Sequence, residues 1–280
     1  MGIGLRPELW PALQETRRQL DWLEVIPENH VAHGGWRRSQ FLGALARWPV
    51  VAHGVSISVG GPDPLDDSYL RALKELLDEA GAEFYSDHLC WTAFRGHHYH
   101  DLLPLPFTEE AVRWTAGRAR KVSDLLERPV LLENITYYAR MPASRLTEGE
   151  FVRAVLEESG SYLLLDVNNA YQNAVNHGLE PIEVLEALPL ERTRQIHLAG
   201  HELDDEGLLL DRHGTPVSDA VWSLYEAAIH RVGAVPTLIE WDNDIPPLDR
   251  VLDEADHARR LQNVVTAHGS EAPSAAEARA

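Results

Sequence analysis

The sequence predicts a single-domain (β/α)8 barrel, the TIM-barrel form of the α/β class. Short apolar runs alternate with longer segments of helical period, as in repeated β-loop-α units built on a parallel sheet. There are eight such runs, which is the number of strands that closes a barrel. A chain of 280 residues with 44% hydrophobic content can also bury the core of one such domain.

The predicted strands are short runs rich in aliphatic and β-branched residues. They cover residues 2–5, 22–26, 50–56, 83–87, 130–133, 162–167, 195–199 and 236–241. Helices are predicted at 68–80, 108–126, 147–158, 182–187, 218–231 and 247–268. In the first of these, Leu70, Leu73 and Leu77 fall on one face and charged residues on the other, so the leucines can pack against the sheet.

The predicted barrel domain spans residues 1–268. The last residues, 269–280, are small and polar and have no apolar period. Such a segment cannot bury enough apolar surface to offset the entropy lost on ordering, so we predict a disordered C-terminal tail.

Charge and composition narrow the classes of partner and compartment. The formal net charge of −19 would repel a phosphate backbone, so we expect no nucleic-acid partner. The single cysteine, Cys90, excludes an intramolecular disulfide and fits a reducing compartment. The N-terminus lacks the pattern of a signal peptide, and no run approaches the roughly 18 apolar residues that span a bilayer. We therefore expect a soluble, cytoplasmic protein without membrane association.

Histidine, aspartate and glutamate occur at or just after the ends of six predicted strands. In a barrel these carboxyl ends meet at one mouth, where enzymes of this fold have their active sites. Burying several acids together costs several kcal/mol unless positive charge compensates them, and multivalent cations do this well. The six residues are His53, His88, Glu133, Asp166, His197 and Glu240.

Two further residues, Asp211 and His213, lie on the loop after the seventh strand and can close over the same mouth. One ion with open positions needs only three or four protein ligands, so eight candidates indicate two or three ions, with Glu133 and Glu240 able to bridge. Mixed imidazole and carboxylate ligands suit iron, manganese or zinc.

Other polar residues near the strand ends are assigned supporting roles. His201 is our candidate catalytic residue, as a proton donor or substrate contact; simple packing beneath its loop is the alternative. Asn134 and Asn168 either orient ligands and substrate or form turns.

The second strand and one histidine tract are placed outside the ligand set. Glu24, Glu28 and Asn29 are expected to support the site or close a loop rather than to bind metal. The tract RGHHYHD, which holds His97, His98 and His100, is expected to be a solvated loop outside the site.

The chain closely resembles the multinuclear non-heme iron-dependent oxidative enzymes, from residue 2 to about residue 265. The resemblance rests on seven strings in this order: AHGVSIS, YSDHLCW, LLENI, LLLDVNN, IHLAGHE, DRHGTPV and IEWDNDIP. Each string is weak by itself, but together they are specific. The family includes the methanobactin oxazolone-forming enzyme and an enzyme of thiaglutamate biosynthesis, both of which modify peptides.

The resemblance implies two to three iron ions of mixed Fe(II)/Fe(III) state and O2 as co-substrate. The implied substrate is a cysteine of a ribosomally synthesised precursor peptide, and a small partner protein would bind the leader of that peptide. By position, His53, His88 and Glu133 would hold one iron, and Glu133 would bridge to a second. The second would be held by Asp166, His197 and Glu240, and Asp211 and His213 would complete a third site with Glu240.

The residues alone leave two other functions open. The first is a manganese- or zinc-dependent isomerase or hydrolase on a xylose-isomerase-like barrel. The negative net charge disfavours a nuclease among the hydrolases, and the absence of lysine near the strand ends disfavours an isomerase. The second is a catalytically idle barrel that only binds a peptide. The metal content of the purified protein distinguishes these functions.

Overall fold

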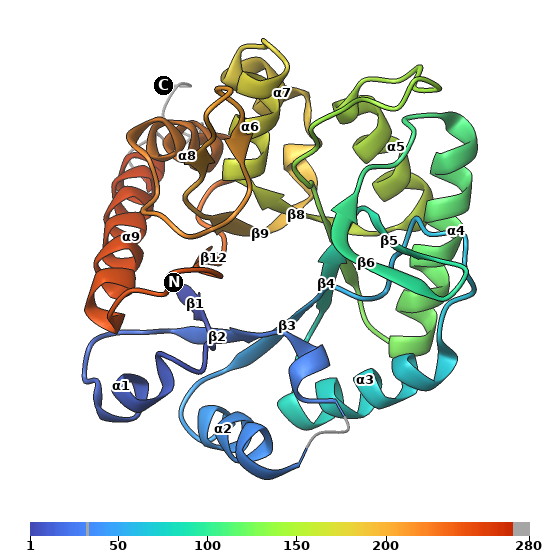
Figure 1. The fold of residues 1–280 in the computed structure, drawn as a ribbon. Helices are drawn as coiled ribbons and strands as arrows, with labels where there is room; N and C mark the ends of the chain where they lie inside the picture. The colour runs from blue at the N-terminus through green and yellow to red at the C-terminus, as the bar shows by residue number, and fades with distance from the viewer. Residues whose placement is uncertain (32–33, 271–280) are drawn as a thin grey trace, which may run out of the picture.

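The computed structural model describes residues 1–31 and 34–270. Eight parallel strands form a closed barrel in the order β1-β12-β9-β8-β7-β4-β3-β2, which confirms the predicted fold. Figure 1 shows these strands as a central ring with helices around the outside. The strands are β1 (Gly2–Gly4), β2 (Trp22–Val25), β3 (Val50–Gly54), β4 (Tyr85–His88), β7 (Val130–Glu133), β8 (Tyr162–Asp166), β9 (Thr193–Leu198) and β12 (Thr237–Ile239).

Each of the six predicted helices overlaps one observed helix. They are α3 (Asp67–Ala80), α4 (Glu109–Leu126), α5 (Glu148–Ser159), α7 (Pro181–Ala187), α8 (Asp219–Val232) and α9 (Leu248–Ser270). The side chains of Thr108, Thr147 and Ser218 each accept a backbone N–H in the first turn of α4, α5 and α8. Leu70, Leu73 and Leu77 of α3 are buried in the layer between helices and barrel.

Three helices were not predicted: α1 (Trp10–Glu15), α2 (Gly35–Leu45) and α6 (Val167–Asn176). Helix α1 has only six residues, and α2 is weakly amphipathic and contains two glycines. Helix α6 buries Asn169, Gln172 and Asn173, so its inward face is polar and the usual apolar period is missing.

A two-stranded hairpin, β5 (Trp91–Phe94) and β6 (His97–Leu103), lies beside the barrel. The prediction that the histidine tract is a loop is therefore wrong, although β6 is largely exposed. Arg95 and Gly96 form the turn, both with positive φ, as in the tight turns that favour hairpins. Asp63 accepts both of their backbone N–H groups.

A second, shorter hairpin joins β10 (Glu202–Leu203) to β11 (Leu209–Leu210), and two 3-10 helices, η1 (Pro27–Asn29) and η2 (Leu190–Arg192), complete the described elements. Helix α9 continues to Ser270, two residues into the predicted tail, and residues 271–280 lie outside the described part of the chain. Within residues 1–31 and 34–270, no helix combines the length and the apolar character of a bilayer-spanning segment.

Candidate metal centre

The carboxyl ends of the barrel strands surround a cavity of about 720 Å³. Six of the eight predicted ligands line it, and Asp166 and His197 lie deeper, with no exposed surface. The six are His53, His88, Glu133, Asp211, His213 and Glu240. The convergence that the strand ends predict is therefore present in the structure.

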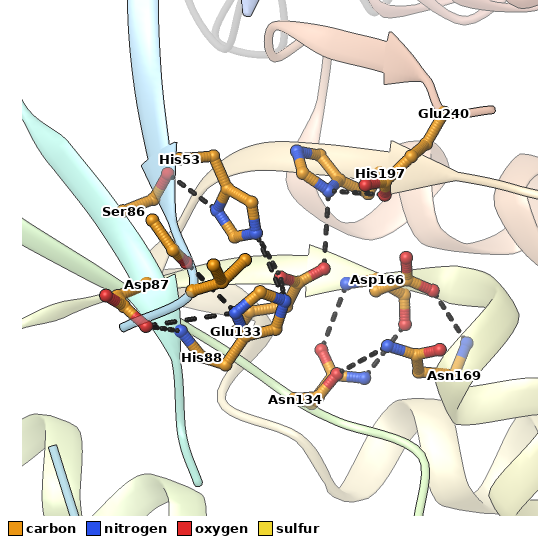
Figure 2. Close-up of polar contacts among 12 residues, drawn as sticks. His53, Ser86, Asp87, His88, Glu133, Asn134, Asp166, Asn169, His197 and Glu240 are labelled. Carbon is orange, nitrogen blue, oxygen red and sulfur yellow. Dashed lines mark hydrogen bonds and ion pairs between the residues drawn. The ribbon is translucent and has the colours of Figure 1, made fainter. Parts of the chain in front are cut away.

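The first group of donor atoms comes from β3, β4 and β7 (Figure 2). The Nε2 atoms of His53 and His88 lie 3.2 Å apart, and Glu133 Oε2 lies 3.0 Å from the first and 3.2 Å from the second. An ion with bonds of about 2.1 Å at right angles holds its donors about 3 Å apart. The three atoms thus already have the spacing of one face of a coordination sphere.

The second group contains Glu133, Asp166, His197 and Glu240, whose donor atoms all lie within 4.8 Å of one another. His197 Nδ1 is 3.3 Å from Glu133 Oε1 and 3.1 Å from Glu240 Oε2. Glu133 therefore belongs to both groups and turns a different oxygen toward each. This is the arrangement of a carboxylate that bridges two ions.

The third group is formed by His213, Glu240 and Asp242. His213 Nδ1 lies 3.0 Å from Asp242 and 3.6 Å from Glu240, and its Nε2 lies 2.6 Å from Asp211 Oδ1. Asp242 was not among the predicted ligands, although it stands two residues after Glu240 in IEWDND. Asp211 and Glu240 approach opposite nitrogens of the His213 ring.

The outer nitrogens of two histidines are bound to the barrel wall. His88 Nδ1 donates to the carbonyl of Gly54 at 3.1 Å. His53 Nδ1 lies 3.0 Å from Ser86 Oγ, whose hydroxyl donates to Ala52 O. Such partners fix the ring and its tautomer and leave the Nε2 lone pairs directed at the first group.

Gly54 is required at its position for steric reasons. A Cβ there would lie 1.7 Å from the Tyr85 hydroxyl, which itself donates to the buried Asp87 carboxylate. Asp87 also accepts the backbone N–H groups of its neighbour His88 and of Ile57, so its carboxylate links β4 to the loop after β3.

The electrostatics show that the cluster attracts positive charge. Burial alone would lower the pKa of His88, but Glu133 and Asp87 outweigh it and raise the value to about 9. At His197 and His213, too, the charges of neighbouring carboxylates outweigh burial and raise the pKa. Burial and the charge of Glu133 raise the pKa of Asp166 well above its usual range. Protons therefore compensate the acids when no cation does so.

Four buried donor atoms in the cluster lack a hydrogen-bond partner. They are Glu133 Oε2, Asp166 Oδ2, His197 Nδ1 and His213 Nε2. Three of them, Glu133 Oε2, His197 Nδ1 and His213 Nε2, face only the ionisable atoms of other candidate ligands, at 2.6–3.3 Å, and Asp166 Oδ2 has no partner among the described residues. Metal ions of the type that accept imidazole and carboxylate fit these residues.

Supporting residues orient the deepest ligand. The side chain of Asn134 donates to Asp166 O at 2.8 Å and accepts its backbone N–H at 3.0 Å. Asn169 N donates to Asp166 Oδ1, which leaves Oδ2 for another partner. Of the two roles expected for Asn134, orienting a ligand or forming a turn, these contacts support the first.

His201 lies beside the cavity and is absent from its lining. Its Nδ1 is 2.7 Å from Asn168 Oδ1, and its ring stacks on Tyr171 with centroids 5.3 Å apart. Burial lowers the pKa of His201.

The residues of the second strand take supporting positions. Glu24 lies in the barrel interior and contacts His197, whereas Glu28 accepts from Val55 N and Tyr69 Oη. None of the three residues Glu24, Glu28 and Asn29 belongs to a ligand group among the described residues.

Two histidines of the β5–β6 hairpin lie on the rim of the site. His98 and His100 line the cavity, although neither belongs to a ligand group among the described residues. A second cavity of about 740 Å³ lies next to the first, and Ser56 and His98 line both. The hairpin thus stands between the metal-ligand cluster and a neighbouring cavity.

Comparison with known proteins identifies relatives over nearly the whole chain. Residues 1–263 match the family model described as RiPP precursor modification enzyme MbnB/TglH/ChrH, where RiPP denotes a ribosomally synthesised and post-translationally modified peptide. A UPF0276 protein of Caulobacter vibrioides is 47% identical over 259 residues, which is 92% of each chain. A UPF0276 protein of Acaryochloris marina is 43% identical over 257 residues, again 92% of each chain.

Solved structures with the same fold include sugar epimerases. D-Psicose 3-epimerase from Clostridium cellulolyticum H10 aligns with a TM-score of 0.59 at 10% identity, covering 94% of this chain and 98% of the epimerase. An L-ribulose 3-epimerase aligns with a TM-score of 0.59 at 16% identity, covering 97% and 98%. At such low identity these structures show a shared barrel and nothing about the reaction.

Proposed function

Because the chain belongs to the RiPP precursor modification enzyme MbnB/TglH/ChrH family, we propose that it is an O2-dependent multinuclear iron oxidase that modifies cysteine residues of a precursor peptide. The family supports the peptide substrate. Iron as the metal, O2 as the co-substrate and cysteine as the modified residue are our own proposal. It is supported by the resemblance to the multinuclear non-heme iron-dependent oxidative enzymes and by the imidazole and carboxylate donors of the site.

One observation carries the proposal: Glu133 directs its two oxygens at two different sets of buried donors. A single ion would leave one of these sets without compensation, so the arrangement supports a centre with at least two ions. Oxygen and imidazole donors without thiolate suit iron in two oxidation states.

We assign the predicted ligands to ions as follows. The first ion would be held by His53, His88 and Glu133, and the second by Glu133, Asp166, His197 and Glu240. A third would be held by Asp211, His213 and Glu240, the set that the resemblance implies; the His213 ring would have to turn for this, because Asp211 faces its Nε2 and Glu240 its Nδ1. Asp242 approaches His213 as well and is an additional candidate for that ion.

When bound, the iron would supply a Lewis acid that acidifies a substrate thiol and a redox centre that reacts with O2. The chain's own residues position the substrate and balance charge. The cavity is open at the rim and ends on buried ligands, so a side chain can enter while bulk water is displaced from the base. Arg6, which is held by Asp242 and donates to Trp241 O, adds positive charge to the rim.

His201 is our candidate for proton transfer. Its lowered pKa keeps the ring neutral at pH 7, so the nitrogen that does not contact Asn168 is able to accept a proton. A His201→Ala variant is expected to retain its iron while turnover falls by about 10²–10⁴-fold. Iron analysis and peptide mass spectrometry check this, and a variant with wild-type turnover would remove His201 from the mechanism.

The substrate peptide and its delivery complete the proposal. The two adjoining cavities offer space for a cysteine at the ligand cluster and for flanking peptide residues beside the hairpin. We propose that a small partner protein binds the leader, and that the enzyme acts in the cytoplasm, where ribosomes make the peptide.

The test uses the full-length enzyme, loaded anaerobically with Fe(II) and then exposed to O2. The peptide is a short cysteine-containing product encoded beside the gene, supplied with and without a neighbouring small protein. We expect two to three irons per chain, O2 consumption that depends on the peptide, and a change in the peptide mass confined to the cysteine.

Other outcomes identify the alternatives. Binding of zinc or manganese alone, without O2 consumption, would support an isomerase or hydrolase. A protein that binds no metal but retains the peptide would support a binding scaffold. Either result would overturn the oxidase assignment.

A further inference from the structure

A second cavity of about 740 Å³, here called the side cavity, adjoins the metal-ligand cavity. It is bordered by the loop after β3, the start of α3 and the β5–β6 hairpin. The chain segment 55–58 forms the wall between the two cavities: Val55 and Ser56 line the metal-ligand cavity, and Ser56 and Ile57 line the side cavity. The volume of the side cavity lies in the range of sites that bind small ligands.

Hydrogen bonds hold this wall in place. Glu28 accepts the Val55 backbone N–H at 3.0 Å and the Tyr69 hydroxyl at 2.9 Å. Asp87 accepts the Ile57 backbone N–H at 3.3 Å. The side cavity is therefore formed before any ligand arrives, which reduces the entropy lost on binding.

The charged side chains around the side cavity are already bound to the backbone. Arg118 donates to three backbone carbonyls of the 58–63 loop. Asp63 accepts both N–H groups of the hairpin turn at 2.8 Å, and Asp66 accepts two N–H groups in the first turn of α3. Because a charged ligand would have to compete with these bonds, the three side chains offer it little gain.

The rest of the inner wall of the side cavity is apolar. Ile57, Leu70 and Ala93 line it and are buried, and Leu65 lines it and is half-buried. An apolar side chain that entered would be removed from water by contact with these residues, and this stabilises binding without any need for a polar partner.

The remaining polar side chains lie at the edges of the side cavity. Ser56 and His98 line both cavities and so stand at the boundary between them. Arg95 is exposed, and its guanidinium lies 5.0 Å from the centroid of the Phe94 ring. These groups can bond to the backbone of a peptide that passes from one cavity to the other, whereas the interior suits an uncharged side chain.

We propose that the side cavity is a specificity subsite that binds an apolar side chain of the precursor peptide, such as leucine, within about three residues of the modified cysteine. The spacing follows from the shared wall, because an extended peptide advances about 3.3 Å per residue and the wall is a single segment of chain. The inference rests on the proposed function, since it takes the cysteine to lie at the ligand cluster, and it adds the class of residue that the enzyme recognises beside it.

Binding of short peptides to the full-length wild type tests the proposal. The protein is loaded with Zn(II) in place of iron, so that a cysteine can bind without being oxidised. The probes are N-acetylated heptapeptides of alanine with a central cysteine, in which one alanine at a time is replaced by leucine, aspartate or lysine. Leucine at one position is expected to lower the Kd about 10–30-fold relative to alanine, measured by calorimetry, whereas aspartate and lysine give no gain.

Leu65→Asp is the variant that alters the side cavity. It places a charge among the apolar residues, so the preference for leucine over alanine is expected to disappear while the alanine peptide binds as it does to the wild type. Leu179→Asp is the matched control, because Leu179 is 53% exposed and lines neither cavity. A folded Leu65→Asp protein that keeps the full preference for leucine overturns the proposal.

Photo-cross-linking to the wild type decides the matter if Leu65→Asp does not fold. Benzoylphenylalanine replaces the preferred leucine of the peptide, and the cross-linked residues are identified by mass spectrometry. We expect adducts within residues 56–70 or 93–98, and adducts confined to other parts of the chain overturn the proposal. Equal binding of all the peptides overturns this inference alone, whereas a Zn(II)-loaded protein that binds none of them overturns the proposed cysteine-peptide substrate as well.

Discussion

At the scale of single residues, Glu133 distinguishes a shared metal centre from separate sites. Its oxygens lie 3.0–3.3 Å from the nitrogens of three histidines on three different strands. We predict that Glu133→Gln removes the one negative charge that two ions share, so both of these ions are lost and bound iron falls by two per chain, from two to none or from three to one. Iron analysis after anaerobic loading measures this.

The comparison variant for Glu133 is His53→Ala, which alters only the first group. It is expected to lose one ion and to keep the second. If Glu133→Gln also lost a single ion, the carboxylate would not be a bridge.

Glu148 gives a prediction about pH and stability that does not involve the metal ligands. Burial raises its pKa to about 7 from an ordinary 4.5, and only the neutral donors Tyr137 and Asn173 contact it. The folded state therefore holds this proton more tightly than the unfolded state. Its contribution to the free energy of unfolding is lost as pH rises from about 4.5 through 7.

We predict that the wild type loses about 1–3 kcal/mol of stability over that range relative to Glu148→Gln, which has no proton to release. Urea unfolding of both metal-free proteins at pH 4.5, 5.5, 6.5 and 7.5 measures the difference. Other titrating groups are common to the two proteins and cancel. Parallel pH profiles would show that Glu148 is ionised in the folded state.

At the scale of elements, the sequence predicts those parts of the fold whose buried face is apolar. Helix α3 shows its leucine stripe and was predicted, whereas α6 presents Asn169, Gln172 and Asn173 to the interior and was missed. Asn169 and Asn173 bond to the loop after β7: Asn173, for example, accepts Tyr137 N and donates to Ile135 O, whereas Gln172 donates to Asp211. Because these inward-facing residues are polar, α6 lacks the apolar periodicity from which a buried helix face is predicted.

The β5–β6 hairpin was missed for a different reason. Its second strand is exposed and carries consecutive polar residues, so there is no alternation to detect. The Arg95-Gly96 turn is the only local signal, and arginine is uncommon at positive φ. Because the hairpin was not predicted, the position of His98 and His100 on the rim could not be predicted either.

We predict that the hairpin contacts the peptide and not the metal. The double variant His98→Ala/His100→Ala is expected to keep its full iron content, because neither residue belongs to a ligand group of the described chain. The KM for the peptide should rise by about tenfold, the loss expected for one or two hydrogen bonds, with a smaller change in kcat. Steady-state kinetics measure both.

His97→Ala is the control for the hairpin variant. The His97 ring packs on Tyr99 at 5.1 Å and does not line the cavity. It is expected to leave KM unchanged. Loss of iron from the double variant would instead make the hairpin part of the metal centre.

At the scale of the whole molecule, closure of the barrel is what made the candidate site predictable. Eight parallel strands bring residues as distant in sequence as His53 and Glu240 to one mouth, so potential ligands at strand ends were expected to meet. Asp242 was missed because it follows β12 on a loop, and only the bend of that loop brings it to His213. Strand ends follow from topology, whereas loop geometry does not.

The same convergence makes the stability of the whole chain depend on metal. The acids of the cluster are buried in a chain of formal net charge −19, and only protons and the Arg6 guanidinium compensate them in the metal-free state among the described residues. Each ion bound at about 100 times its dissociation constant adds about 2.7 kcal/mol to the free energy of unfolding. Two ions should raise the melting temperature by about 5–10 °C in a chain of this size.

Thermal unfolding of the chelator-treated protein, with and without added Fe(II) under anaerobic conditions, measures this effect at pH 7. The increase should be largely lost in Glu133→Gln and retained in Glu148→Gln, because only the first replacement removes a shared donor. It should also shrink below pH 6, where protons compete with metal for the same imidazoles and carboxylates. An identical melting temperature with and without metal would mean that the cluster is held together by protons alone, and the metal centre would have to be abandoned.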